Sequence, residues 1–158
     1  MKITLILSFL FLNLNLYSQF PGIEYSKNYG GTQFENPCRI IATNDNGYLL
    51  VGDTSSDDYD VVLNKGNSDF FIIKTDFDGN ILWTKTFGGS GYDVAADVIE
   101  DENNNYLIVG SSNSSDGDKS ILFWGYDIWV IKIDNLGNLI WEETFGGSSA
   151  DGASQIIK

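Results

Sequence analysis

The sequence contains no histidine and a single cysteine, and these two absences remove much of the chemistry that small enzymes use. Without an imidazole there is no Ser–His–Asp triad, no histidine metal ligand and no histidine acid–base catalyst. Cys38 alone can form no internal disulfide and no structural zinc site. The equivalent positions of the repeat described below hold Ala96 and Ser154, so a small buried side chain accounts best for Cys38.

Basic residues are also scarce, with 9 Lys and Arg against 22 Asp and Glu and a formal net charge of −13. A chain this acidic repels phosphate backbones and anionic lipid surfaces, so neither nucleic acid nor such a membrane is an expected partner. Cations, basic proteins and neutral glycans stay open as partners. Dispersed acids also keep a β-rich extracellular protein soluble, which is the simpler interpretation of the charge.

Long hydrophobic runs are absent after the first residues of the chain. Lys2 is followed by a mostly apolar run over 5–16, and the small residue Ser18 precedes Gln19. This layout predicts a secretory signal peptide over residues 1–18 and a secreted or cell-surface protein. The run is too short to span a membrane, and no later stretch approaches the required length. We therefore expect no membrane insertion.

A fixed period of 58 residues runs through the rest of the chain. Residues 30–87 align with residues 88–145 without insertion or deletion, and 20 of the 58 positions are identical. A glycine pair after an aromatic residue marks each start: Gly30-Gly31, Gly88-Gly89 and Gly146-Gly147. A period of this length indicates one supersecondary unit per repeat, which buries its apolar faces against its neighbours.

Each period is predicted to form four short antiparallel strands, because its apolar runs are rich in β-branched and aromatic residues and show no helical stripe. The predicted strands are 39–43, 48–53, 70–75, 81–87, 98–100, 106–111, 128–133 and 139–145. Several runs are apolar at nearly every position, which indicates strands covered on both faces. The predicted fold is therefore all-β, with four-stranded blades of a β-propeller over residues 19–158.

The predicted propeller is incomplete, with about two and a half blades. Residues 23–29 would supply the last strand of a preceding blade, and residues 155–157 the first strand of a following one. A closed propeller needs four to eight blades. We expect an N-terminal fragment of a longer chain in preference to self-association, because exposed blade faces favour aggregation.

Residues 87–118 and 127–147 resemble the SBBP class of β-propeller repeats. The shared marks are the aromatic-Gly-Gly start, the acidic residue after it (Glu35, Asp93, Asp151), the Asn/Gly-Tyr-Leu turn and the Asp-x-x-Gly-Asn-x-x-Trp hairpin. The resemblance covers residues 23–158, and the leader and Asn-rich turns are similar to those of exported Bacteroidetes proteins. It implies a secreted binding or adhesion scaffold with no family-wide catalytic residue.

Two features predict a calcium site, and each has a simpler structural explanation. Asp76, Asp78 and Asn80 offer several oxygens in a tight loop. An Asp-initiated hairpin turn with Gly79 explains the same residues without an ion, and the second repeat replaces Asp78 with Leu136. The Ser/Asp-rich loops over 54–60 and 112–118 offer further oxygens or are simply solvated. No other cofactor is expected.

Tryptophan recurs at one fixed position of the repeat, as Trp83 and Trp141. A large aromatic residue in the same place in each unit is most simply a packing residue between blades. The glycine pairs are interpreted as turns between blades, since no helix follows them as a phosphate-binding loop would require.

The second repeat adds two aromatic residues, Trp124 and Tyr126, where the first has Gly66 and Ser68. They would stack on sugar rings or anchor a protein partner, or else cover a blade face. We predict a non-enzymatic scaffold that binds an extracellular glycan or protein through the loops between the second and third strands. The alternatives are a polysaccharide-active catalytic propeller and a calcium-stabilised structural module.

Overall fold

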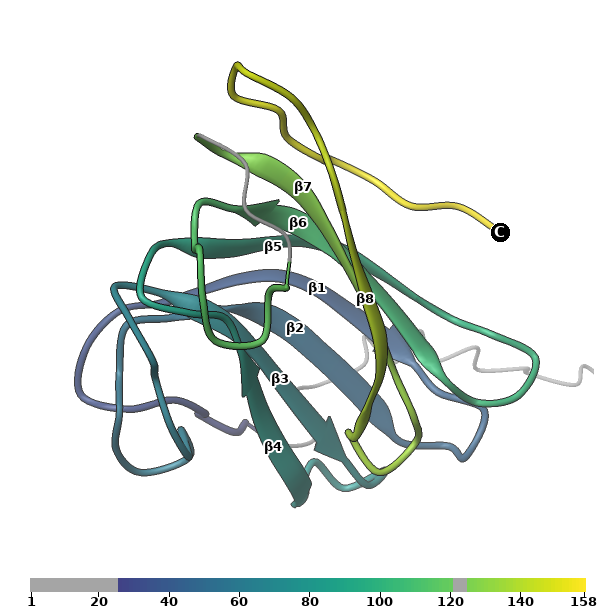
Figure 1. Cartoon of the computed structure of the whole chain (residues 1–158). Coiled ribbons are helices and arrows are strands. Elements are labelled where there is room, and N and C mark those ends of the chain that lie inside the picture. Colours follow the sequence, from purple (N-terminus) through teal and green to yellow (C-terminus); the bar gives the residue numbers. More distant parts are fainter. Residues whose placement is uncertain (1–25, 121–124) are drawn as a thin grey trace, which may run out of the picture.

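The computed structural model describes residues 26–120 and 125–158, and in this part of the chain the protein is all-β, as predicted (Figure 1). The strands are β1 (Glu35–Ala42), β2 (Tyr48–Thr54), β3 (Asp69–Thr75), β4 (Ile81–Phe87), β5 (Asp93–Glu100), β6 (Tyr106–Ser112), β7 (Asp127–Ile133) and β8 (Leu139–Phe145). Residues 26–120 and 125–158 contain no helix that could cross a membrane. The predicted signal peptide and Trp124 lie outside the described residues.

The strands form two antiparallel four-stranded sheets, in the orders β1-β2-β3-β4 and β5-β6-β7-β8. Each strand of the second sheet begins 58 residues after its counterpart in the first. The turns use residues that tolerate a left-handed backbone: Asn46 and Asn104 have φ of 65° and 61°, and Gly79 and Gly137 have φ of 75° and 78°. Equivalent sequence thus produces equivalent hairpins in the two sheets.

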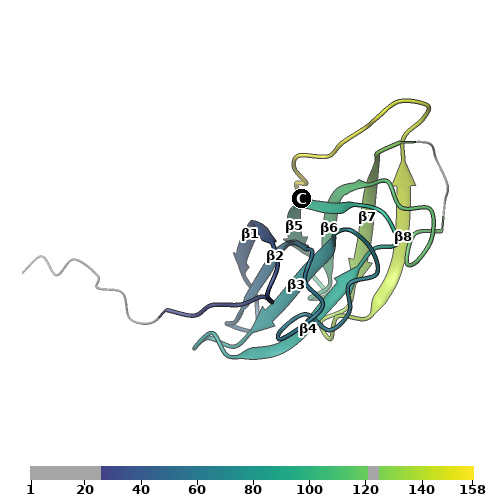
Figure 2. The ribbon, with the colours of Figure 1, turned by 90° about the vertical axis from the view of Figure 1, so that its left-hand side faces the viewer.

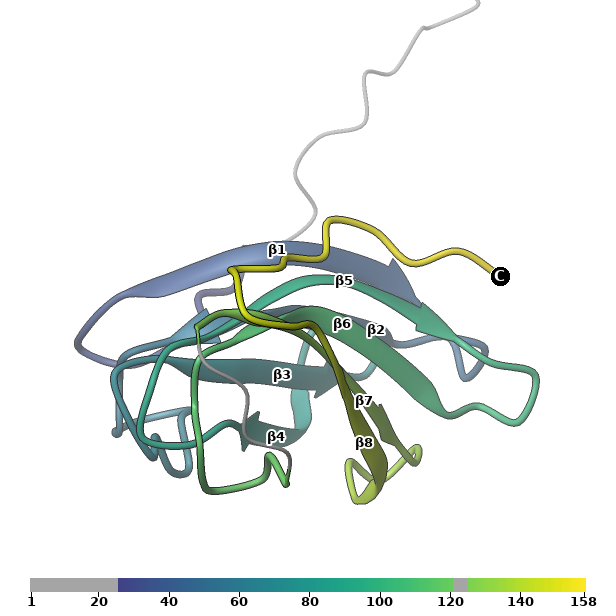
Figure 3. The ribbon, with the colours of Figure 1, turned by 45° about the horizontal axis from the view of Figure 1, so that its top comes forward.

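One face of the first sheet packs against the second sheet and forms the main core. Its members are Leu49, Val51, Phe70, Ile72, Phe87, Ala95, Val98, Tyr106, Ile108, Trp129, Ile131 and Ile133. The ring centroids of Phe70 and Trp129 lie 4.9 Å apart across this contact. Strand β5 contacts β1, β2 and β3, while β4 and β8 stand well apart, so the sheets diverge toward their last strands (Figures 2 and 3).

A second, smaller core covers the other face of the first sheet. Phe71, Ile73 and Val61 are buried there, with Tyr29 and Leu50 packed against them. Because β3 has apolar side chains on both of its faces, all seven of its residues are buried. This explains why its sequence does not alternate between apolar and polar residues.

The strand predictions fail mainly at the sheet edges. Strands β1 and β5 begin at Glu35 and Asp93, several residues before the predicted starts, and each contains a register shift. Polar residues and Pro37 hide the start of β1 from a propensity argument, yet an edge strand tolerates proline. Residues 155–157 form no strand, since no described strand pairs with them.

Candidate functional site in the loops after the second strands

The Ser/Asp-rich loop of the first repeat unit holds the glycine-pair segment by its backbone. Alternate side chains of this loop accept hydrogen bonds from three backbone amides of residues 30–33. Asp60 Oδ2 accepts from Gly30 N at 3.0 Å, Asp58 Oδ1 from Thr32 N at 2.8 Å, and Ser56 Oγ from Gln33 N at 2.8 Å. A Cβ at Gly31 would lie 2.3 Å from Asp58 Oδ1, so the close approach requires glycine there.

The second repeat unit builds the same ladder 58 residues later. Asp118 Oδ2 accepts from Gly88 N at 3.0 Å, Asp116 Oδ1 from Ser90 N at 2.7 Å, and Ser114 Oγ from Gly91 N at 2.9 Å. These loops are partly exposed, as expected for Asp116, but Ser56 and Ser114 are buried and the aspartates of the ladder hold the backbone of the glycine-pair segment. At Gly147, by contrast, an added Cβ would meet nothing within 4 Å.

Two buried carboxylates beneath this ladder were not predicted as a site. Asp69 and Asp93 are fully buried, and one oxygen of each has no hydrogen-bond partner. Both approach Gly88, where an added Cβ would lie 2.4 Å from Asp69 Oδ1 and 2.5 Å from Asp93 Oδ2. Burial, reinforced by the charge of Asp93, raises the pKa of Asp69 to about 6. A carboxylate pair closed to solvent in this way cannot contact a polysaccharide.

A related buried acid, Asp127, begins β7 at the position equivalent to Asp69. Its nearest cation is Lys119, whose Nζ lies 3.7 Å from Asp127 Oδ2, and both side chains are fully buried. A Cβ on Gly146 would lie 2.0 Å from Asp127 Oδ1. The first glycine of each later pair thus lies directly on the buried aspartate that begins the third strand of the preceding unit.

The residues predicted to bind calcium form an aspartate-initiated hairpin turn. Asp76 Oδ1 accepts from Asn80 N at 2.8 Å and Asp76 Oδ2 from Asn80 Nδ2 at 2.9 Å. These bonds lower the pKa of Asp76. Asp134 and Asn138 repeat the arrangement, although Leu136 stands in place of Asp78. Among the described residues no group of three or more Asp, Glu or Cys side chains is placed to hold a metal ion.

The two recurring tryptophans have different surroundings. Trp83 Nε1 donates to the carbonyl of Asn135 at 3.1 Å, and a Cβ on Gly137 would lie 3.1 Å from its ring, so Trp83 contacts the β7–β8 hairpin of the next unit. Trp141, in the same place on β8, is 41% exposed. Phe145 likewise is 54% exposed, whereas its counterpart Phe87 is 6% exposed. The face of β8 that carries Trp141 and Phe145 is therefore exposed, whereas the equivalent face of β4 packs against the second sheet.

Of the two aromatic residues proposed to bind a ligand, the structure describes Tyr126. Its ring is exposed and its carbonyl accepts a hydrogen bond from Asp151 N at 2.6 Å. The thiol of Cys38 is not a reactive nucleophile, because it donates its S–H to the carbonyl of Val51 and burial raises its pKa to about 11.

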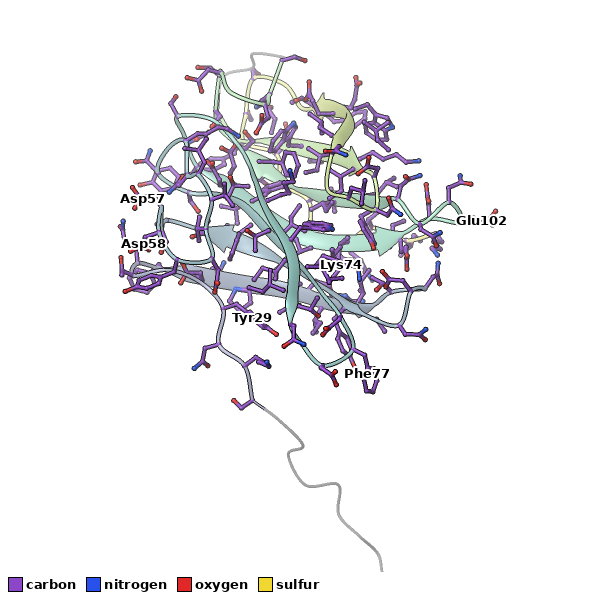
Figure 4. All side chains as sticks on the ribbon, turned by 90° about the horizontal axis from the view of Figure 1, so that it is seen from below. Tyr29, Asp57, Asp58, Lys74, Phe77 and Glu102 are labelled. Atoms are coloured by element: carbon purple, nitrogen blue, oxygen red, sulfur yellow. The ribbon has the colours of Figure 1, made fainter. Side chains whose placement is uncertain are left out.

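A polar hollow that the sequence did not reveal lies at the loop end of the first unit. It has a volume of about 280 Å³ and is lined by Gln33, Ser55, Asp57, Asn64, Gly66 and Asn67. Asp57 and Asp58 lie at the opposite end of the molecule from Glu102, which is in the β5–β6 turn (Figure 4). A larger hollow of about 390 Å³, on the outer face of the first sheet, is lined partly by Tyr29, Leu50 and Phe71.

Comparison with known proteins adds no functional assignment, since the chain matches no protein-family model and no curated protein.

Proposed function

We propose that this chain is part of a secreted, non-enzymatic β-propeller of the SBBP type that serves as a binding or adhesion scaffold. The single observation that carries the proposal concerns the loops after the second strands, in which some residues hold the fold together and the residues between them vary. In both units alternate residues of the loop hold the glycine-pair backbone through equivalent hydrogen bonds. The side chains between them differ from one unit to the other, as Asp57 does from Ser115.

Propeller assembly is supported by the way the two sheets use equivalent faces. The face of the first sheet that carries Trp83 and Phe87 packs on the second sheet, and the equivalent face of the second sheet leaves Trp141 and Phe145 exposed. The opposite face of the first sheet carries the hollow beside Tyr29 and Leu50. A further unit of the same repeat, in a longer chain or in a second copy, would cover such faces.

Secretion is part of the proposal because of the charged, apolar and small-residue pattern over residues 1–18. A binding role is preferred to catalysis because Asp69 and Asp93, two carboxylates that meet beside Gly88, are buried. Glu142, an acid on β8, already accepts a hydrogen bond from Trp129 Nε1 at 2.9 Å.

The proposal is tested by presenting the purified chain to immobilised extracellular polysaccharides and matrix proteins while soluble sugar is assayed. Retention on at least one surface without release of reducing sugar is the expected result. Failure to bind any surface contradicts the scaffold function, and release of reducing sugar favours the catalytic alternative.

A further inference from the structure

The hollow at the loop end of the first unit has side chains that the fold does not use. Among the described residues, no hydrogen bond engages the side chains of Gln33, Ser55 or Asp57, although the Gln33 amide N–H belongs to the ladder. Asn64 Oδ1 accepts a local hydrogen bond from Gly66 N, and Asn67 Nδ2 donates at 3.4 Å to the carbonyl of Ser90 in the next unit. The lining therefore combines free amide, hydroxyl and carboxylate groups in one concave place.

The repeat provides an internal reference, because the second unit builds the same ladder with a different lining. Gln33, Ser55, Asp57 and Asn67 correspond to Gly91, Asn113, Ser115 and Gly125. The second unit has glycine in place of Gln33 and serine in place of Asp57, and it still forms its ladder, so the ladder does not need the carboxamide of Gln33 or the acid of Asp57. These groups are therefore additions to the framework, which is expected of a binding site.

Tyr59 is a second such addition, two residues along the loop from Asp57. Its φ is 53°, and its side chain is 83% exposed. The second unit places Gly117, with φ of 71°, at the equivalent position. A non-glycine residue in the left-handed region is strained, and such strain is concentrated at binding sites. The first unit thus holds an exposed aromatic ring where the backbone favours glycine.

A second exposed ring belongs to Phe34, which follows Gln33 in the chain. It is 86% exposed, and its carbonyl accepts a hydrogen bond from Ser55 N at 2.8 Å, so its backbone lies beside the hollow. Exposed rings on residues adjacent in the chain to the lining provide apolar surface that a polar ligand can contact.

We propose that this hollow binds a residue of a neutral glycan, and this assignment rests on the proposed scaffold function. Sugar hydroxyls both donate and accept hydrogen bonds, and so they match a lining of carboxamides, a hydroxyl and one carboxylate. A calcium ion requires more oxygens than a single acid provides and is poorly matched to amide N–H donors. The net charge of −13 disfavours acidic sugars. A volume of about 280 Å³ lies just below the range of typical small-molecule pockets, which limits the bound group to a small one.

The assignment is tested by titrating the full chain with cellohexaose, mannohexaose, xylohexaose and chitohexaose in a calorimeter, and with oligogalacturonate as an acidic comparator. We expect at least one neutral oligosaccharide to bind and oligogalacturonate to bind more weakly. Asp57→Ala and Gln33→Ala should each weaken binding about tenfold, as expected when a hydrogen bond to the ligand is lost. Ser115→Ala, at the position equivalent to Asp57, is the matched control and should bind as the parent chain does.

Both lining residues are at the surface, so circular dichroism should show that the variants remain folded. The proposal is overturned if none of the neutral oligosaccharides binds in the millimolar range, or if Asp57→Ala and Gln33→Ala bind them as well as Ser115→Ala does. If these variants keep full affinity for a polysaccharide surface, the hollow is not the site but the scaffold function stands. If the parent chain binds no surface at all, both proposals fail.

Discussion

Tyr59 is the residue at which stability and the proposed binding role conflict most directly. A left-handed backbone costs an L-residue roughly 1–2 kcal/mol. Glycine adopts this backbone without that cost, but its larger loss of conformational entropy on folding offsets part of the gain. Because the ring is exposed, its removal loses little burial. We therefore expect Tyr59→Gly to stabilise the chain by about 0.5–1 kcal/mol in urea denaturation. Tyr92→Gly, at a position without positive φ, should not stabilise; a loss of stability in Tyr59→Gly would contradict the strain argument.

Asp69 should make the folded chain more stable in mild acid. Its folded-state pKa of about 6 lies above the unfolded value of about 3.9, so between these values the folded chain binds the extra proton. Stability should rise by about 1–3 kcal/mol as the pH falls from about 7 to about 4.5, and should decline at lower pH where Asp45 and Asp134, whose pKa values are lowered, become protonated.

The matched variant is Asp69→Asn, which keeps the shape of the side chain without its charge. It should raise the melting temperature at neutral pH and remove most of the rise on acidification, measured by differential scanning calorimetry across the pH range. An Asp69→Asn chain with unchanged pH dependence would contradict the assignment of this effect to Asp69.

At the scale of elements, the ladder between loop and glycine pair is expected to dominate local stability. Ser114 is buried, accepts from Gly91 N at 2.9 Å and donates to Asp93 Oδ2 at 2.8 Å. Ser114→Ala leaves both partners without this bond and should cost about 2–3 kcal/mol in urea denaturation. Ser115→Ala, which is exposed, should change stability by about 0.5 kcal/mol or less; equal effects in the two variants would argue against the ladder.

The elements that sequence predicts well are those defined by neighbouring residues. The β3–β4 and β7–β8 hairpins follow from Asp-x-x-Gly-Asn, because the bonds from Asp76 to Asn80 span four residues. The ladder was missed because its contacts join Gln33 to Ser56 and Gly30 to Asp60, far apart in the chain. The alternation of Ser and Asp at every second residue was the available signal, but it resembled a solvated loop.

The buried acid at Asp69 and the polar hollow were missed for a related reason. Asp69 and Asp127 occupy equivalent positions of the repeat, yet the burial of a carboxylate under a glycine pair depends on how two sheets meet. The hollow is lined by Gln33 and Asn67, which lie far apart in the sequence of the first unit. Composition and periodicity predict the sheets, whereas the site depends on the path of two long loops.

At the scale of the whole molecule, Trp83 and Trp141 form a matched pair at one position of the repeat. Trp83 contacts the next unit and is partly buried, so Trp83→Ala should cost about 2–4 kcal/mol. Trp141 lies on the uncovered face, and Trp141→Ala should cost about 1 kcal/mol or less in dilute solution. Similar losses in both variants, measured by urea denaturation, would contradict the contrast between the covered and uncovered faces.

The central claim is that each unit stacks on the next as the first stacks on the second. The most direct test is a chain in which a second copy of residues 88–145 follows Phe145, compared with the parent chain in urea denaturation. If units stack through equivalent faces, the longer chain should unfold in one transition at higher urea, with a steeper denaturant dependence and Trp141 fluorescence shifted to the blue. A separate transition at lower urea, with Trp141 still solvent-exposed, would contradict repeat stacking and with it the propeller assignment.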